Sequence, residues 1–297
     1  MFKSGFVGII GKPNVGKSTL FNCIIGEKVA ITTHKPQTTR NRIVGIKNSD
    51  RGQIIFLDTP GIHRAKTPLN SYMVSTAFNT FADVDVILFI VDAETPFGEE
   101  DVLIVNSMKN TTVPVILLIN KIDLVEKERL LPLIDELKDL HSFRDIIPLS
   151  ALKEFNVDTL VNVIWNLLPE GPKYFPDDMY TDSSERFIAA EIIREKVMLL
   201  THQEIPYSTA VVLEAFKEDE KRNLIRMRAT INVEKNSQKG IIIGKKGSML
   251  KEIGKQARLE MEKFFGTRIF LELFVRVSKD WTRNERMLTE LGYKIGK

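Results

Sequence analysis

Two glycines, a lysine and a serine stand near the start of the chain at a spacing that suits phosphate binding. The segment is Gly11-Lys12-Pro13-Asn14-Val15-Gly16-Lys17-Ser18, followed by Thr19, and it has the pattern G-x-x-x-x-G-K-S. The glycines would let the backbone turn tightly and bring its N–H groups against phosphate oxygens. Lys17 would place its charge on the β- and γ-phosphates, and the Ser18 hydroxyl would bind Mg²⁺. We therefore predict that residues 11–19 bind the phosphates of a nucleoside triphosphate.

A threonine and an aspartate further along could complete this site. Residues 31–40 are polar and lack periodicity, which predicts a loop, and most such loops are ordinary surface loops. A threonine placed there can reach Mg²⁺ only while the γ-phosphate is present. The apolar residues 53–57 predict a buried strand, and Asp58-Thr59-Pro60-Gly61, the pattern D-x-x-G, follows it. We expect Asp58 to hold Mg²⁺ through a water and the Gly61 amide to sense the γ-phosphate.

A third motif predicts which base the nucleotide carries. Apolar residues 115–119 lead into Asn120-Lys121-Ile122-Asp123, the pattern N-K-x-D. Asp123 would accept hydrogen bonds from the N1–H and N2–H₂ groups of guanine, and adenine would leave this carboxylate unpaired because it lacks both donors. Lys121 would pack over the ring, and Asn120 would join this loop to the phosphate-binding loop. The backbone of Ser150-Ala151-Leu152 would contact the guanine O6, so we predict GTP rather than ATP.

The elements that must position these motifs are strands followed by loops and helices. Residues 6–10 and 86–91 are short apolar runs typical of buried strands, and residues 18–25 carry apolar side chains at helical spacing. Phosphate binding needs this order of strand, glycine loop and helix, because the helix dipole adds positive potential at the loop. We also expect an edge strand over residues 42–47 and a closing helix over residues 157–168.

Composition limits the class of protein. The chain has 297 residues, which predicts two domains, and its single cysteine excludes an internal disulfide. No apolar run of about 18 residues could span a membrane, and no signal peptide fits the start, so we expect a cytoplasmic protein. Residues 1–171 contain 18 Lys and Arg against 20 Asp and Glu, whereas residues 172–297 contain 24 against 19. The basic second part suggests nucleic acid as a partner.

A short glycine motif lies within this basic part. It is Gly244-Lys245-Lys246-Gly247, the pattern G-x-x-G, and between Lys235 and Arg258 seven residues are basic and only Glu252 is acidic. The two glycines would let an RNA backbone approach closely, and the lysines would meet its phosphates. The alternative to an RNA-binding loop is a glycine turn beside a helix face that is simply exposed to solvent. The predicted contacts to single-stranded RNA are Ile241, Gly244, Lys245, Lys246, Gly247, Ser248 and Lys251.

The expected elements of this part have a recognisable order. We expect a helix over residues 184–202, strands over 209–216 and 224–233, a helix over 248–265 after the glycine motif, and a strand over 268–277. An apolar half-turn should precede the motif. The order helix, strand, strand, helix, G-x-x-G, helix, strand is similar to that of the type II KH fold.

Taken together, the motifs resemble the Era family, a branch of the translation-factor-like GTPases, over nearly the whole chain. The resemblance implies an α/β fold: a Ras-like P-loop GTPase domain, with a mostly parallel sheet and helices on both faces, followed by a smaller α+β type II KH domain. We expect the first domain over residues 1–171 and the KH domain with its tail over residues 184–297. The intervening residues 172–183 are rich in proline and read as a linker.

The resemblance also implies ligands and partners. It implies Thr39, beside Arg40, as the switch threonine, with Thr38 as the second choice. Mg²⁺ would then be held by Ser18, Thr39 and, through a water, Asp58. GTP and GDP would be the ligands, the 3′ end of small-subunit ribosomal RNA and the small ribosomal subunit would be the partners, and subunit assembly would be the role. We expect a monomer.

Two other functions remain open at this point. The first is a signalling GTPase that contacts anionic lipid peripherally at the inner face of the cell membrane through its basic domain, although the sequence shows no amphipathic anchor helix or lipidation motif. The second is an RNA-binding protein whose nucleotide domain has lost its activity. Because every nucleotide motif is intact, we favour the active switch.

How hydrolysis is driven is a separate question. Ras-like enzymes carry a glutamine directly after D-x-x-G to orient the attacking water, but this chain has the apolar Ile62 there. His63 could take that role, and Arg40 and Arg42 lie near the switch. The Asn14 carbonyl could instead bind K⁺ beside the phosphates, as in similar potassium-activated GTPases, or Asn14 could simply bond the switch loop. The predicted catalytic residues are Lys17, Thr39, Gly61 and Asn14.

Overall fold

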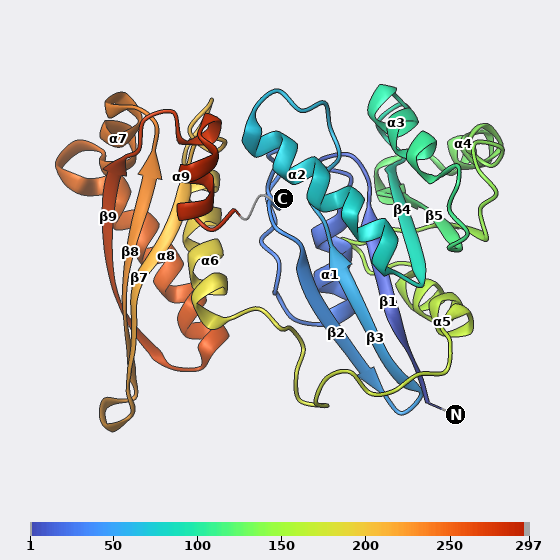
Figure 1. The fold of residues 1–297 in the computed structure, drawn as a ribbon, viewed down its shortest axis with the longest axis horizontal. Helices are drawn as coiled ribbons and strands as arrows, with labels where there is room; N and C mark the ends of the chain where they lie inside the picture. Colours follow the sequence, from blue (N-terminus) through green and yellow to red (C-terminus); the bar gives the residue numbers. More distant parts are fainter. Residues whose placement is uncertain (1, 294–297) are drawn as a thin grey trace. The chain divides into compact units, whose positions relative to one another are not determined.

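The computed structural model describes residues 2–293, which form two compact units (Figure 1). The first unit contains the residues up to Asp182, apart from Thr33–Lys35 and Lys66–Tyr72. Those two short segments cluster with the second unit, which begins at Ser183.

A six-stranded sheet forms the centre of the first unit. Its strand order is β2-β3-β1-β4-β5-β6, and only the pair β2 and β3 is antiparallel. The strands are β1 (Lys3–Ile10), β2 (Ile43–Ser49), β3 (Gly52–Asp58), β4 (Val86–Asp92), β5 (Val115–Asn120) and β6 (Asp145–Pro148). The central strands are apolar on both faces because helices cover both. The predicted mostly parallel sheet and the predicted edge strand are therefore confirmed.

Helices cover this sheet on two sides. They are α1 (Lys17–Ile25), α2 (Pro68–Asn79), α3 (Glu99–Met108), α4 (Leu130–Leu137) and α5 (Val157–Leu167), with short 3₁₀ turns η1 (Thr80–Asp83), η2 (Ile122–Leu124) and η3 (Lys127–Arg129). Helices α2, α3 and α4 pack on the face that carries Ile55, Phe89 and Leu117. Helix α1 packs Phe21 against Gly45 on the opposite face, where it also contacts α5.

The carboxyl ends of the parallel strands carry the predicted motifs. The glycine loop follows β1, Asp58 ends β3, Asn120 ends β5, and Ser150 lies just after β6. Since these strands run parallel, their carboxyl ends lie along the same edge of the sheet, which is the usual ligand position in such folds.

The proline-rich segment before the second unit lies along the first unit. The N–H groups of Tyr174 and Phe175 donate to Oε1 of Gln53 in β3, at 3.0 and 2.9 Å. The Tyr180 carbonyl accepts from the N–H of Ile46 in β2 at 2.9 Å. Residues 172–182 thus belong to the first unit, and the limits of the predicted domains and linker remain a prediction.

The second unit is a three-stranded sheet with helices on one face. Strand β8 (Leu224–Val233) pairs antiparallel with β7 (Ala210–Asp219) and parallel with β9 (Arg268–Val277). The helices are α6 (Glu185–Leu200), α7 (Asn236–Ile243), α8 (Ser248–Phe265) and α9 (Glu285–Glu290), with 3₁₀ turns η4 (Glu220–Arg222), η5 (Lys245–Gly247) and η6 (Trp281–Arg283). The core contains Ile192, Ile231 and Ile253 from α6, β8 and α8.

The sequence predicted most of these elements closely, with two differences. Strand β7 continues to Asp219, beyond the predicted end at residue 216, because its last residues still pair with β8. The helix expected before G-x-x-G is α7 at residues 236–243, which is longer than the expected apolar half-turn; Gln238 starts it by accepting from the Lys235 N–H at 3.1 Å. Trp281 is fully buried.

Helix α8, with 18 residues, is amphipathic, with Ile253, Ala257 and Met261 buried.

Within residues 2–293, no helix combines the length and the apolar character needed to cross a membrane.

Candidate functional site

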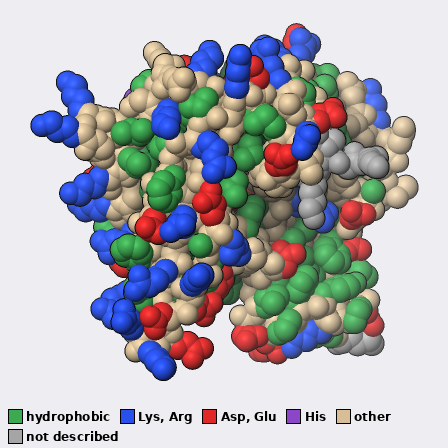
Figure 2. Space-filling model, turned by 60° about the vertical axis from the view of Figure 1, so that its left-hand side comes forward, with side chains coloured by type: hydrophobic (Ala, Val, Ile, Leu, Met, Phe, Trp, Pro, Cys, Tyr) green, Lys and Arg blue, Asp and Glu red, His purple; other side chains and the backbone are tan. Residues whose placement is uncertain are grey.

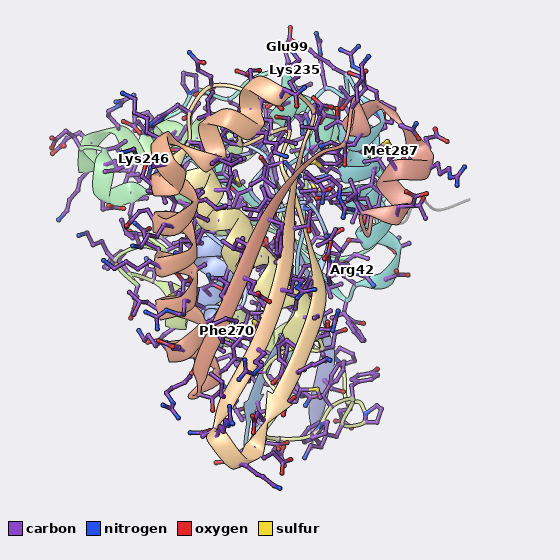
Figure 3. The ribbon with its side chains drawn as sticks, turned by 90° about the vertical axis from the view of Figure 1, so that its left-hand side faces the viewer. Arg42, Glu99, Lys235, Lys246, Phe270 and Met287 are labelled. Carbon is purple, nitrogen blue, oxygen red and sulfur yellow. The ribbon has the colours of Figure 1, made fainter. Side chains whose placement is uncertain are left out.

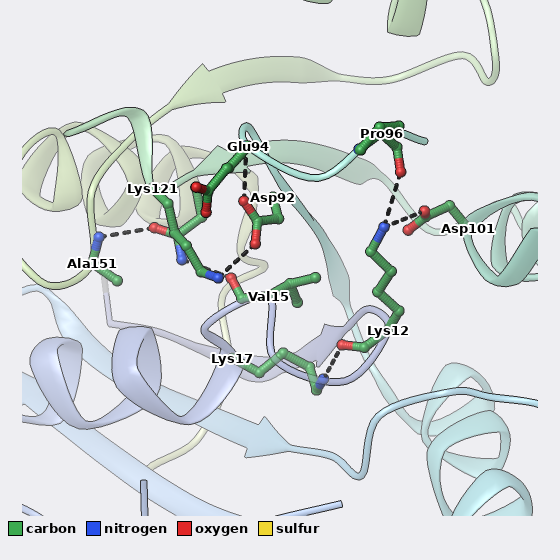
Figure 4. Close-up of polar contacts among 10 residues, drawn as sticks. Lys12, Val15, Lys17, Asp92, Glu94, Pro96, Asp101, Lys121 and Ala151 are labelled. Atoms are coloured by element: carbon green, nitrogen blue, oxygen red, sulfur yellow. Dashed lines mark hydrogen bonds and ion pairs between the residues drawn. The ribbon is translucent and has the colours of Figure 1, made fainter. Parts of the chain in front are cut away.

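The phosphate-binding loop connects β1 to α1, and Lys17 folds back over it. The Lys17 ammonium donates to the carbonyl oxygen of Gly11 at 3.1 Å. It also donates to the carbonyl oxygen of Lys12 at 2.8 Å (Figure 4). Burial lowers the pKa of Lys17 to about 8, although the negative charges of Asp58 and Glu100 oppose this shift. Phosphate oxygens beside the ammonium would favour its charged form, so the loop suits an anionic ligand.

Three side chains meet at the end of β3. The Ser18 hydroxyl donates to Oδ2 of Asp58 at 2.7 Å, and the Thr39 hydroxyl donates to the same atom at 3.3 Å. The two hydroxyl oxygens lie 2.8 Å apart. The structure therefore brings together the three predicted metal ligands, including Thr39 as the first choice for the switch threonine.

The burial and the hydrogen bonding of Asp58 suit a carboxylate that binds a cation. It is fully buried, and burial raises its pKa to about 6, opposed by the hydrogen bonds from Ser18 and Thr39 and by the charge of Lys17. Its Oδ1 atom is buried without a hydrogen-bond partner among residues 2–293. Oxygen atoms are the ligands that Mg²⁺ prefers, so this group of side chains fits the metal, while each ligand's role remains a prediction.

The D-x-x-G motif lies against the phosphate-binding loop. A Cβ atom on Gly61 would lie 2.7 Å from the backbone nitrogen of Pro13, so this close approach requires glycine. The Ile62 side chain is fully buried, and its N–H donates to the Gly11 carbonyl at 3.1 Å. The His63 ring nitrogens lie 2.8 Å from the Gly61 carbonyl and 3.4 Å from the Gln37 side chain. Ile62 cannot orient a water.

The predicted base-binding loops are tied to one another and to the phosphate-binding loop. The Asn120 amide donates to the Val15 carbonyl at 2.7 Å and accepts from the Ala151 N–H at 2.9 Å. The Ser150 hydroxyl donates to Oδ1 of Asp123 at 2.6 Å. The predicted connection through Asn120 is confirmed, and the exposed Asp123 carboxylate is fixed on one side.

Two residues of this region were not predicted from the sequence. Asp101 of α3 is fully buried and accepts from the Lys12 ammonium at 2.8 Å, and Asp92 accepts from Lys121 at 2.5 Å (Figure 4). Both carboxylates fix a lysine of a nucleotide motif. Lys12 and Asp101 are 89 positions apart, so no local pattern could have indicated the pair.

The predicted RNA-binding loop joins α7 to α8 in the second unit. Gly244 has a φ of 72°, and a Cβ there would lie 2.8 Å from the Met249 side chain, so glycine is required. The lysines point outward, and Figure 3 shows Lys246 at the margin of the unit, away from the sheet. The exposed residues of the predicted set are Ile241, Lys245, Lys246, Ser248 and Lys251. The geometry suits a nucleic acid backbone, and the contacts themselves remain a prediction.

Two family models match the chain. One, described as 50S ribosome-binding GTPase, matches residues 6–121, and the other, described as KH domain, matches residues 204–282. Among curated proteins, GTPase Era of Syntrophus aciditrophicus is 66% identical over 99% of this chain and 96% of that protein. GTPase Era of Geotalea daltonii is 58% identical over 99% of this chain and 98% of its own length.

Solved structures of similar proteins share the fold over both units. Era in complex with MgGDPNP and nucleotides 1506–1542 of 16S ribosomal RNA has a TM-score of 0.96 and 46% identity, and covers 99% of this chain and 100% of that chain. A variant of Aquifex aeolicus Era bound to GDP and AlF₄⁻ has a TM-score of 0.95, also at 46% identity and with the same coverage.

Proposed function

Because the chain belongs to the Era family of GTPases, we propose that it is a switch that hydrolyses GTP, binds small-subunit ribosomal RNA and acts in small-subunit assembly. One observation carries the nucleotide part: the phosphate, metal and base motifs converge at the carboxyl edge of one sheet, connected by Ser18, Asp58 and Asn120. Such an arrangement is suited to bind a guanine nucleotide both at its phosphates and at its base.

The RNA part of the proposal is supported by the solved complex of Era with 16S ribosomal RNA. That RNA belongs to the small subunit, whereas the matching GTPase family model is named for the 50S subunit. Since the similarity to Era covers both units and the family model covers only part of the first, we favour the small subunit. The exposed lysines of the loop at residues 244–247 would meet the RNA phosphates.

Magnesium is part of the proposed chemistry. The Ser18 and Thr39 hydroxyls would hold the ion, with Asp58 acting through a water, and the MgGDPNP in the Era complex supports this choice. When bound, Mg²⁺ offsets the negative charge that the β- and γ-phosphates carry. Lys17 supplies a second positive charge from the loop itself.

Asn14 is proposed to contribute a monovalent cation site to hydrolysis. Ile62 is buried and apolar, and His63 makes contacts through both ring nitrogens, so neither offers the usual water-orienting amide. Asn14 is exposed on the phosphate-binding loop with a φ of 65°. A K⁺ ion at its carbonyl oxygen would supply positive charge where negative charge develops.

Hydrolysis should therefore depend on the monovalent salt. We expect single-turnover GTP hydrolysis by the unmodified protein to be about tenfold or more faster in KCl than in NaCl. Asn14→Ala should hydrolyse GTP at the same rate in both salts, while Asn106→Ala, an exposed asparagine on α3, should behave as the unmodified protein. Equal rates of the unmodified protein in the two salts would end the K⁺ proposal.

Nucleotide state is proposed to control RNA affinity. The segments Thr33–Lys35 and Lys66–Tyr72 flank Thr39 and Gly61 in the sequence, yet both cluster with the second unit. GTP orders the region around Thr39 and Gly61 through the γ-phosphate and its metal, and GDP releases it. We expect this difference between the two nucleotide states to change the RNA affinity of the second unit.

The proposed function is tested by RNA affinity in the two states. Fluorescence anisotropy with a labelled RNA of 16S nucleotides 1506–1542 should give different dissociation constants with a non-hydrolysable GTP analogue and with GDP. An RNA of the same length and composition in scrambled order controls for charge. Equal constants in both states would remove the coupling, and equal binding of both RNAs would remove the ribosomal target.

Three finer expectations stay with this proposal: a monomeric state, a cytoplasmic location and peripheral contact with anionic membrane. For the last, the described residues offer only a basic surface, which ribosomal RNA would use equally well. We favour RNA as the partner, because the solved Era complex contains 16S ribosomal RNA.

A further inference from the structure

One face of the sheet in the second unit leaves side chains of β8 and β9 exposed along part of its length. The side chains of Ile231, Val233 and Ile269 point into the core below the other face, and the alternating residues of β8 and β9 point outward. We call this outward surface the open sheet face, defined by Arg226, Arg228, Phe270, Glu272, Phe274 and Arg276. Figure 3 looks onto it, with Phe270 labelled.

Two aromatic rings lie on the open sheet face in contact with water. Phe270 is 47% exposed and Phe274 is 51% exposed. The guanidinium of Arg226 lies 5.5 Å from the centre of the Phe270 ring, and that of Arg228 lies 5.9 Å from the Phe274 ring. The rings are four residues apart on one strand, a spacing of about 13 Å. Each ring is thus accessible and has a cation beside it.

Charge on the open sheet face is predominantly positive. The register places Arg226 beside Phe270 and Arg228 beside Glu272, so charged and aromatic side chains alternate. Arg228 meets Glu272 at 3.4 Å and Arg276 meets Glu214 at 3.5 Å, both exposed pairs. Exposed ion pairs of this kind contribute little to the stability of the fold, so a phosphate could displace the carboxylates from the arginines. Figure 2 shows basic side chains interspersed with apolar and acidic ones on one face of the molecule.

We propose that the open sheet face binds a second segment of RNA, with unpaired bases stacked on Phe270 and Phe274 and phosphates against Arg226, Arg228 and Arg276. Exposed aromatic rings on a sheet with flanking arginines are the features that bind single-stranded RNA elsewhere. The inference extends the proposed RNA function, and it adds a surface distinct from the loop at residues 244–247, which joins the helices of the covered face. A protein partner fits less well, because interface cores are depleted of charge and here charges separate the rings.

The test compares a long RNA with a short one. The long RNA is 16S nucleotides 1506–1542, and the short one is a single-stranded piece of its 3′ end that can occupy only the loop. The double variant Phe270→Ala/Phe274→Ala should weaken binding of the long RNA about tenfold or more and leave the short RNA unchanged. Leu259→Ala removes a matched apolar side chain, 51% exposed on α8, and should change neither affinity. Equal thermal unfolding midpoints confirm that the variants are folded.

Two further readouts separate stacking from a general effect on the fold. In Phe274→Trp, the long RNA should quench the new fluorescence, which is distinct because Trp165 and Trp281 are 3% and 0% exposed. Phe274→Leu should lose affinity although it stays apolar. Arg226→Gln/Arg228→Gln should lower the slope of log affinity against log salt concentration by about 1.4.

The possible outcomes distinguish the two surfaces. Unchanged affinity of the double alanine variant for the long RNA, or an unquenched tryptophan, would overturn the open sheet face as an RNA site. Normal binding of both RNAs with lost binding to intact small subunits would assign the face to a protein, and would also overturn the proposal. Failure of the loop itself would appear separately, as unchanged short-RNA binding when Lys245 and Lys246 are replaced.

Discussion

Asp123→Asn should convert the protein from a GTP-binding to a xanthosine triphosphate-binding one. The Asp123 carboxylate is predicted to accept from the two guanine donors, whereas an asparagine would offer one donor and one acceptor. Xanthine carries an acceptor at its 2-position where guanine carries a donor, so the asparagine amide suits xanthine. We expect GTP affinity to fall on the order of a hundredfold, about 3 kcal/mol, because a charge-assisted pair is lost and a mismatch introduced.

The structure explains why this substitution should act on the base alone. Asp123 is exposed and is held on one side by the Ser150 hydroxyl at 2.6 Å, a contact that an asparagine carbonyl can also accept. Competition of xanthosine and guanosine triphosphates against a labelled nucleotide measures the effect. Asp158→Asn makes the same chemical change at an exposed position of α5, and this variant should bind GTP normally. An Asp123→Asn protein with unaltered GTP preference would show that Asp123 does not read the base.

Lys245→Asp/Lys246→Asp should separate RNA binding from nucleotide binding. Both side chains are exposed in the turn between α7 and α8, where the change replaces two attractive phosphate contacts with two repulsive ones. We expect RNA affinity to fall by about 2 kcal/mol or more, roughly thirtyfold, in low salt. GTP affinity should be little changed.

A control of equal charge makes this prediction specific. Lys109→Asp/Lys127→Asp changes the net charge by the same amount at exposed positions of the first unit. It should reduce RNA affinity only slightly, through the general field of the protein. If both double variants lose affinity equally, the loop has no special role and the KH prediction for residues 244–247 is wrong.

The nucleotide motifs could be predicted because each lies in a short segment between a strand and a loop. Asp58, Asn120 and the glycine loop follow apolar runs whose length and composition indicate buried strands, and parallel strands bring such segments to one edge. The sequence also predicted α8, because its apolar residues keep helical spacing over 18 positions. The local sequence pattern predicts the structure correctly where a single helix or strand determines the position of the residues.

Other features depend on contacts between distant segments, which a local pattern does not contain. The pair Lys12 and Asp101 forms across 89 positions. The full length of helix α7 was not predicted, because Gly240 and a run of isoleucines hide the helical period, and the Gln238 side chain that starts the helix is effective only in the folded geometry. The open sheet face needed the register of β8 and β9, since only the pairing places Phe270 beside Arg226.

We propose that one chain couples a guanine-nucleotide site to recognition of small-subunit ribosomal RNA. Ultraviolet crosslinking of the protein to total cellular RNA, with GTP or GDP present, followed by sequencing of the bound RNA, tests it most directly. We expect crosslinks concentrated at the 3′ end of small-subunit ribosomal RNA, differing in yield between the two nucleotides and reduced in Lys245→Asp/Lys246→Asp. Crosslinks spread over cellular RNA in proportion to its abundance, with the same yield in GTP and GDP, would contradict it.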